Sequence, residues 1–223
     1  METLEQKMGY VFQNRALLRQ ALMHSSYVNE HHMSRHECNE RLEFLGDAVL
    51  ELSSSQFLYE KYPDFPEGEL TKLRASIVCE PTLADCAETL ALGKELLMGH
   101  GEERTGGREK ASLLSDALEA VIGAIYLDGG FANAKEFVER FILNDIEHKK
   151  LFFDSKTILQ ELVQRQELGE LSYELLETEG PDHCKVFTSC VKIQGKKAGV
   201  GTGRNKKLSE QAAAYEAIRK LGQ

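Results

Sequence analysis

The sequence predicts a mainly α-helical protein in which an all-helical domain is followed by a small domain of α-β-β-β-α order. Apolar residues recur at helical spacing from residue 4 to about residue 148. After residue 150 the pattern becomes one short amphipathic helix, two alternating stretches, a glycine-studded stretch and an alanine-rich helix. Charge differs as well, because residues 1–150 carry a net charge of -10 and residues 151–223 carry +1. We expect domains at 4–130, with a last helix running on to about 148, and at 155–223.

Turn signals divide the first domain at "YPDFPEGE" (62–69), "GHGEERTGGREK" (99–110) and "LDGG" (127–130). No apolar run reaches the roughly 18 residues that span a bilayer, and "METLEQKMGY" lacks the order of a signal peptide. The five cysteines form no CxxC pair, which favours reduced thiols over a zinc site. We therefore expect a cytoplasmic protein that makes no membrane contact.

The stretch "NERLEFLGDAVLEL" (39–52) combines an apolar face with an acidic one. On a helix, its four acids fall within an arc of about 80°; they are Glu40, Glu43, Asp47 and Glu51. The opposite face carries Leu42, Leu45, Val49 and Leu52. A single helix of this kind most often has a solvated charged face, so the pattern alone does not indicate a site.

A second helix, within "SLLSDALEAVIGAIYLDGG" (112–130), is apolar almost all round and should be buried. It nevertheless contains Asp116 and Glu119, about 60° apart on one face. Buried carboxylates repel each other and lose hydration unless a positive charge joins them. An arginine partner and a helix cap would be a structural explanation. Together with Glu43 and Asp47, however, the two acids form an oxygen-rich set suited to Mg²⁺, with Mn²⁺ able to substitute.

A ferritin-like di-iron site is the alternative carboxylate centre, but it needs Glu-x-x-His repeats that neither helix contains. An all-carboxylate Mg²⁺ cluster more naturally serves phosphodiester hydrolysis. We expect no small-molecule organic cofactor. The local charge supports a nucleic acid substrate, since residues 183–223 carry nine Lys/Arg against two Asp/Glu.

The second domain carries two features suited to duplex RNA. The helix from Lys156 has a mostly uncharged polar stripe, which suits ribose hydroxyls and base edges in the minor groove of A-form RNA; the stripe is formed by Thr157, Gln160, Glu161 and Gln164. Lys206 and Lys207 stand at the start of the last helix, where free N–H groups also favour a phosphate.

Several motifs together resemble the ribonuclease III family, in the family's order. They are "ALMHSSY" (21–27), "NERLEFLGDAVL" (39–50), "EGELTKLRASIV" (67–78) and "GGREKASLLSDALEAVIGAIYLDGG" (106–130). The resemblance implies that Glu43, Asp47, Asp116 and Glu119 bind metal, with Asp47 and Glu119 catalytic and with Glu40 and Glu67 as supporting acids.

The last domain resembles the double-stranded-RNA-binding domain, which implies further RNA contacts at His183 in "GPDHCK" and at Asn205. Asn205 stands where a serine is more usual, and Ser209 replaces a common alanine, so we expect modest tuning of affinity. Ala212, Ala213 and Ala214 should let the final helix approach the sheet closely.

The resemblance implies a metal-dependent endoribonuclease that hydrolyses double-stranded RNA as a homodimer, each protomer cutting one strand. It further implies 5′-phosphate ends, short 3′ overhangs, and processing of ribosomal and of some messenger and transfer RNA precursors. The alternative is a catalytically silent double-stranded-RNA-binding scaffold. All four carboxylate positions are filled, which favours the enzyme.

The remaining polar residues are His24 and two groups of basic residues, and each basic group has two interpretations. His24 is expected to be a hydrogen-bonded packing histidine, because no second histidine lies at ligand spacing. Arg104, Arg108 and Lys110 either contact RNA or belong to a solvated flexible loop. Lys72 and Arg74 either line the substrate channel or solubilise a surface helix.

Overall fold

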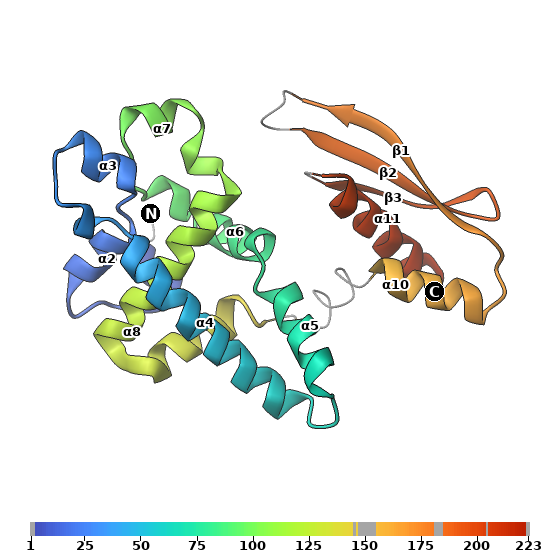
Figure 1. The fold of residues 1–223 in the computed structure, drawn as a ribbon, viewed down its shortest axis with the longest axis horizontal. Coiled ribbons are helices and arrows are strands. Elements are labelled where there is room, and N and C mark those ends of the chain that lie inside the picture. The colour runs from blue at the N-terminus through green and yellow to red at the C-terminus, as the bar shows by residue number, and fades with distance from the viewer. Residues whose placement is uncertain (1–2, 145, 147–154, 181–184, 204, 222–223) are drawn as a thin grey trace. The chain divides into compact units, whose positions relative to one another are not determined.

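The chain folds into two compact units, Met1–Asn144 and Asp145–Gln223 (Figure 1). The computed structural model describes residues 3–144, 146, 155–180, 185–203 and 205–221. Within those residues the first unit contains only helices and the second contains two helices and three strands. The predicted fold class is therefore confirmed. Along the described residues, no helix is both long and apolar enough to cross a bilayer.

The first unit is built around two long helices, α4 and α8, with six shorter ones. In chain order these are α1 (Leu4–Met8), α2 (Arg15–Ala21), α3 (Ser25–Glu30), α4 (Glu40–Lys61), α5 (Glu67–Ile77), α6 (Glu80–Thr89), α7 (His100–Arg104) and α8 (Ala111–Phe141). Short 3-10 turns lie at η1 (Arg35–Glu37), η2 (Leu92–Lys94) and η3 (Gly107–Glu109).

Two of the predicted turns differ from the structure. Residues 99–110 fold largely into α7 and η3 rather than into an irregular loop. At 127–130 the helix continues and the chain breaks only at Gly130, whose φ of 79° and ψ of 178° are non-helical. Glycine tolerates this positive φ, so the helical direction changes here without a longer turn.

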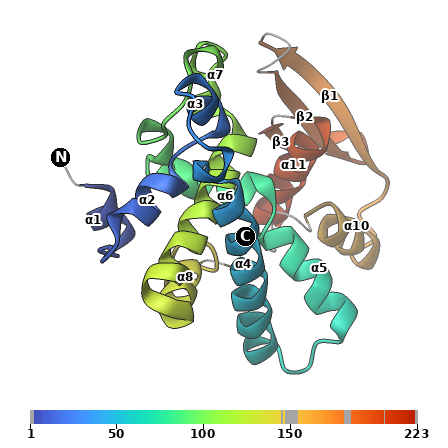
Figure 2. The same ribbon diagram turned by 60° about the vertical axis from the view of Figure 1, so that its left-hand side comes forward.

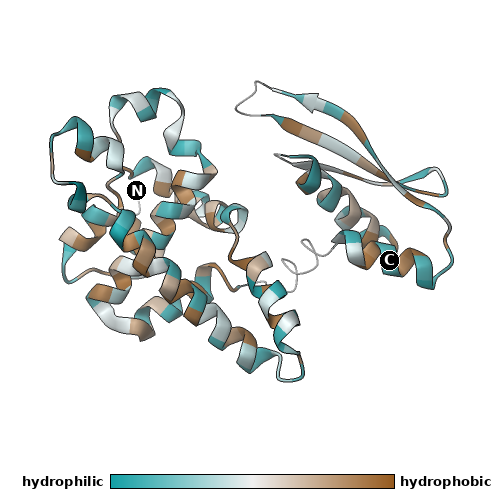
Figure 3. Cartoon of the chain, viewed as in Figure 1, coloured by the Kyte–Doolittle hydropathy of each residue, from teal (hydrophilic) through white to brown (hydrophobic). Residues whose placement is uncertain are grey.

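Amphipathic helices give the first unit its core, and Figure 3 shows hydrophobic and hydrophilic segments alternating along them. The core side of α4 includes Leu42, Val49, Leu50 and Leu58, which are all buried. Leu52, which the sequence placed on the core face, is 57% exposed. The prediction was wrong there because α4 packs on α8 through the side that holds Gly46 and Leu50, which turns Leu52 outwards.

The N-terminal segment is tied to α8 by one carboxylate. Asp128 accepts hydrogen bonds from the backbone N–H groups of Gln13 and Asn14, at 2.9 and 2.8 Å, and from the Tyr10 hydroxyl, at 2.8 Å. Asn14 then caps α2, since its side chain accepts from the N–H of Ala16. Asp128, two residues before the break in α8 at Gly130, thus fixes where α2 begins.

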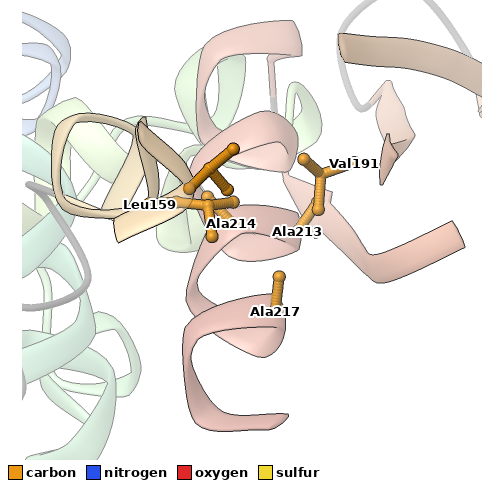
Figure 4. Packing of buried hydrophobic residues seen from close by; sticks show 6 residues of the cluster. Leu159, Val191, Ala213, Ala214 and Ala217 are labelled. Carbon is orange, nitrogen blue, oxygen red and sulfur yellow. The ribbon is translucent and has the colours of Figure 1, made fainter. Parts of the chain in front are cut away.

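The second unit runs α10 (Ser155–Arg165), β1 (Leu171–Glu179), β2 (Val186–Ile193), β3 (Lys196–Gly203) and α11 (Lys206–Leu221). The strands form an antiparallel sheet in the order β1-β2-β3. Its core is a small cluster of side chains from α10, β2 and α11 (Figure 4). The cluster contains Leu159, Val163, Val191, Ala213, Ala214 and Ala217.

Small residues set the distance between α11 and the sheet. A Cβ atom at Gly199 or Gly201 would lie 2.3 or 2.2 Å from backbone atoms of Ala213, so β3 and α11 meet backbone to backbone. Ala213 and Ala214 are fully buried, and a Cβ atom at Gly201 would lie 2.5 Å from that of Ala212, so the three alanines allow the close approach that the sequence predicted. On α10, Leu159 and Val163 are buried, whereas Ile158 and Leu162 are only half-buried.

Candidate functional site

Two glycines allow α4 and α8 to cross at very short distance (Figures 1 and 2). A Cβ atom at Gly46 would lie 1.8 Å from the carbonyl oxygen of Glu119, and one at Gly123 would lie 2.2 Å from the carbonyl oxygen of Leu42. Any larger residue at either position would force the helices apart. The crossing lies at the level of the acidic residues, because Asp47 follows Gly46 and the backbone of Glu119 forms the contact.

This crossing brings the four predicted carboxylates within range of each other's charge. Burial, and after it the charges of Asp47, Asp116 and Glu43, raise the pKa of Glu119 to about 8. Burial also raises the pKa of Glu43, with the charges of Asp116, Glu40 and Asp47 adding to the effect. Two helices that are far apart in sequence therefore contribute to one acidic cluster, formed by Glu43, Asp47, Asp116 and Glu119.

The acidic cluster has no lysine or arginine partner in the described part of the chain. None of its four side chains forms an ion pair there with a lysine or arginine. Within the described residues, no arginine therefore pairs with these acids, as the structural explanation would require. Burial first, and then neighbouring negative charge without a counter-charge, make Glu43, Asp116 and Glu119 hold protons more tightly and raise their pKa values. An added cation would remove both the repulsion and the raised pKa.

The donor set fits a hard divalent cation, since it consists of carboxylate oxygens. Among the described residues, however, no three histidine, cysteine, aspartate or glutamate side chains lie close enough together to hold a metal ion. The carboxylates therefore gather at the crossing without closing into a ligand cage. A bound divalent cation would offset the mutual repulsion of these carboxylates and so favour their closer approach.

The two supporting acids behave differently. Glu40, at the start of α4, contributes to the raised pKa of Glu43 and lies 3.9 Å from Arg35. Glu67, at the start of α5, is exposed and accepts a hydrogen bond from the hydroxyl of Thr71 at 2.9 Å. Glu67 is not among the charges that raise the pKa values of Glu43, Asp116 and Glu119.

Sequence reasoning missed a further acid beside the cluster. Glu80, the first residue of α6, is the main charge that raises the pKa of Asp116 after burial, and His24 partly offsets it. No spacing pattern links Glu80 to the other acids, because it reaches them only through the packing of α6 on α8. Glu51, already on the acidic face in sequence, adds to the raised pKa of Glu119.

Arg74 has a structural partner that neither interpretation of it anticipated. Its guanidinium donates to the Glu51 carboxylate at 2.8 Å and to the Ser55 hydroxyl at 2.7 Å, joining α5 to α4. Both interpretations of Arg74 were therefore incomplete. Lys72 is exposed on α5.

The segment that precedes α8 is folded and internally bonded. Arg108 donates to the carbonyls of Gly93 and Leu96, at 2.9 and 2.8 Å, and to Glu103 at 2.7 Å. Lys110 donates to Glu102. Both side chains are therefore bonded within a folded segment, whereas Arg104 is exposed, and the two interpretations of these residues stay open.

His24 is hydrogen-bonded, as the sequence predicted. Its Nδ1 accepts from the backbone N–H of Ser26 at 3.2 Å and so caps α3. The hydroxyl of Ser26 in turn accepts from the N–H of Gly99 at 2.9 Å.

In the second unit the predicted RNA contacts lie on exposed surfaces of α10 and α11. All four residues of the polar stripe are exposed, namely Thr157, Gln160, Glu161 and Gln164. Lys206 and Lys207 are exposed in the first turn of α11, and Asn205 caps that helix by accepting from the N–H of Leu208 at 2.9 Å. His183 lies outside the described residues.

The raised pKa of Glu119 predicts a pH-dependent change in stability. Because its pKa in the folded chain, about 8, lies above the ordinary value of 4.5, this residue lowers stability progressively as pH rises from 4.5 to 8. Glu119→Gln removes that loss. After allowance for partial exposure we expect about 1 kcal/mol, or about 2–4 °C in unfolding temperature, at pH 8.

Thermal unfolding in EDTA at pH 5 and pH 8 measures this effect. The variant and the parent should unfold at similar temperatures at pH 5, with the variant higher at pH 8. Equal unfolding temperatures at both pH values would contradict the raised pKa.

Comparison with known proteins finds relatives of both units. A family profile described as Ribonuclease-III-like matches residues 14–146, and a double-stranded RNA binding motif matches residues 155–221. The chain is 52% identical to Ribonuclease 3 of Geobacillus sp. strain WCH70, over 98% of this chain and 89% of that protein. It is 51% identical to Ribonuclease 3 of Oceanobacillus iheyensis, over 96% and 95%.

A solved structure agrees with these sequence matches. The nuclease domain of ribonuclease III from Campylobacter jejuni superposes with a TM-score of 0.59 at 48% identity, covering 62% of this chain and 93% of that one. The match by sequence extends over both units, and the match by structure over the length of one nuclease domain. The chain belongs to the ribonuclease III family.

Proposed function

We propose that Glu43, Asp47, Asp116 and Glu119 bind the divalent cation with which this chain hydrolyses double-stranded RNA. Its family membership makes the chain a divalent-metal-dependent endoribonuclease that acts on double-stranded RNA. The observation that supports the residue assignment is the acidic cluster at the Gly46–Gly123 crossing, which has no lysine or arginine partner in the described part of the chain. We propose Mg²⁺ as the ion, with Mn²⁺ able to substitute, and the cytoplasm as the compartment.

The bound ion would activate the attacking water and stabilise negative charge on the phosphate. Asp47 is exposed, so its carboxylate can meet both the ion and the approaching phosphodiester. Glu119 lies deeper, holds a proton at neutral pH while the site has no cation, and gives up that proton when one binds. We propose these two as the catalytic pair and Glu40 and Glu67 as supporting acids. The proposed products carry 5′-phosphates and short 3′ overhangs, as in the processing of RNA precursors.

Cleavage of a long RNA duplex, in Mg²⁺ and in EDTA, tests this function. Single-stranded RNA of the same sequence is the control, because the second unit is a double-stranded RNA binding motif. The proposal requires cleavage only of the duplex and only with the ion. A silent scaffold would instead bind the duplex and leave it intact under both conditions.

We further propose a homodimer that forms through α4. Four residues lie within about 80° on the outer face of this helix; they are Phe44, Ala48, Leu52 and Tyr59. The three large side chains are 79%, 57% and 74% exposed. Such an apolar face favours an isologous contact with a second copy. The nuclease domain from Campylobacter jejuni is itself described as having a region involved in dimer formation.

Phe44→Asp should convert the dimer to monomer, because it places a charge within the proposed apolar contact, at its most exposed side chain. Light scattering coupled to size exclusion measures the mass. Val11→Asp is a matched control, since Val11 is 70% exposed but lies outside α4. A Phe44→Asp protein that keeps the parental mass and fold would exclude α4 as the interface.

Lys206 and Lys207 are proposed to contact phosphates, because both are exposed at the N-terminus of α11. Replacing both with alanine should weaken binding to all duplexes equally and should reduce the salt slope of log affinity by roughly one to two units. Gln160→Ala with Gln164→Ala is the contrasting variant, since loss of neutral contacts should lower affinity with little change in slope. Titrations of one duplex at four salt concentrations decide, and an unchanged slope for the lysine variant would remove these residues from the interface.

A further inference from the structure

Two serines are buried where α11 begins to pack on the sheet. Ser189 of β2 and Ser209 of α11 are both 0% exposed, and their hydroxyl oxygens lie 2.6 Å apart. The rest of this interface consists largely of glycine and alanine, including Gly201 and Ala213. Burying two hydroxyls costs hydration that their mutual hydrogen bond mainly offsets, so such a pair adds little to stability compared with apolar residues.

A third group, the backbone carbonyl of Lys206, decides which serine of the pair donates the hydrogen bond. The Ser209 hydroxyl donates to the backbone carbonyl of Lys206 at 2.9 Å. A serine hydroxyl has a single proton to donate, so Ser209 accepts from Ser189. The result is a directed chain of hydrogen bonds that runs from the central strand β2 to the first turn of α11.

The same turn is held from its other side. Asn205 caps the helix through the N–H of Leu208, at 2.9 Å. A Cβ atom at Gly203 would lie 2.5 Å from the backbone nitrogen of Ser209, so the end of β3 touches the turn directly. The Lys206 side chain, by contrast, is 65% exposed, and the ion pair between its ammonium group and the Glu210 carboxylate is long, at 3.9 Å. The location of its ammonium group therefore depends on where the backbone of this turn is fixed.

We infer that Ser189 and Ser209 are positioning residues for duplex RNA: their buried hydrogen-bond chain fixes the backbone of Lys206 at the height where its side chain meets a phosphate. The inference rests on the proposed phosphate contact of Lys206. A polar pair suits this purpose better than an apolar one, because hydrogen bonds are directional and fix the register of the helix on the strand. A contact that is positioned beforehand loses less entropy on binding.

A double-mutant cycle on the full chain tests the inference, with a fully paired RNA duplex as probe and EDTA to prevent cleavage. In the parent, Ser209→Ala should lower affinity by about threefold to tenfold, the range expected when one hydrogen bond is lost. In the Lys206→Ala background the same change should lower affinity by less than about twofold. Ser172→Ala, on an exposed position of β1, is the matched control and should have no effect in either background.

Equal losses from Ser209→Ala in both backgrounds would overturn the inference, because a merely structural role weakens binding whether or not Lys206 is present. No loss in the parent would overturn it as well. If Lys206→Ala alone leaves affinity unchanged, the proposed phosphate contact fails first. If Ser209→Ala does not fold, Ser189→Ala carries the same cycle, since it leaves the bond from Ser209 to Lys206 in place.

Discussion

Glu119→Gln should abolish cleavage of duplex RNA while leaving duplex binding nearly unchanged. The amide keeps the size of the side chain but removes the charge that the cation requires, at the position where burial and then the charges of the other carboxylates raise the pKa to about 8. We expect the cleavage rate to fall by a factor on the order of 10² to 10³. Gel-shift affinity in EDTA and the cleavage rate in Mg²⁺ should be measured on the same preparation.

Glu136→Gln provides the control, because Glu136 is exposed on the same helix, away from the acidic cluster. This variant should cleave at the parental rate. If Glu119→Gln also cleaves near the parental rate, Glu119 is not a ligand. If it loses binding and cleavage in proportion, cleavage by the first unit and duplex binding by the second are not separate functions.

Gly46→Ala should destabilise the first unit and remove cleavage. The added carbon would lie 1.8 Å from the carbonyl oxygen of Glu119, so the backbones of α4 and α8 must separate. Overpacking of this kind costs about 1 to 3 kcal/mol, or about 2–4 °C in unfolding temperature for each kcal/mol. Separating the helices also moves Asp47 away from Glu119. Thermal unfolding and duplex cleavage would be measured together.

Gly68→Ala is a matched glycine-to-alanine change, because Gly68 is also helical and a Cβ atom there meets nothing within 4 Å. Alanine favours helix, so this control should be neutral or slightly stabilising. A Gly46→Ala protein with parental stability and cleavage would show that the close crossing is not needed to assemble the cluster.

The pattern within single segments predicted much of this molecule. Helical periodicity placed Asp116 and Glu119 in a buried helix, and the two alternating stretches and the glycine-studded one predicted the three strands of the second unit. Both signals are local, because the side chains on one face repeat at the period of the element. The exposure of the polar stripe on α10 followed from the same periodicity.

Features that depend on pairing between distant segments could not be predicted in this way. The helical wheel placed Leu52 inside, but the choice of α8 as partner for α4 turned it outwards. Glu80 reaches Asp116 only because α6 packs on α8. An isolated glycine inside a helical pattern was the one available signal for the crossing, since such a residue often marks close backbone approach.

Cation binding at the crossing of α4 and α8 is the central claim, and anomalous diffraction from crystals grown with Mn²⁺ tests it most directly. The account predicts an anomalous peak bound by carboxylate oxygens of Glu43, Asp47, Asp116 and Glu119. It also predicts that the peak is lost or strongly weakened in Glu119→Gln crystals grown under the same conditions. A peak held by other residues, with none at the crossing, would contradict the account.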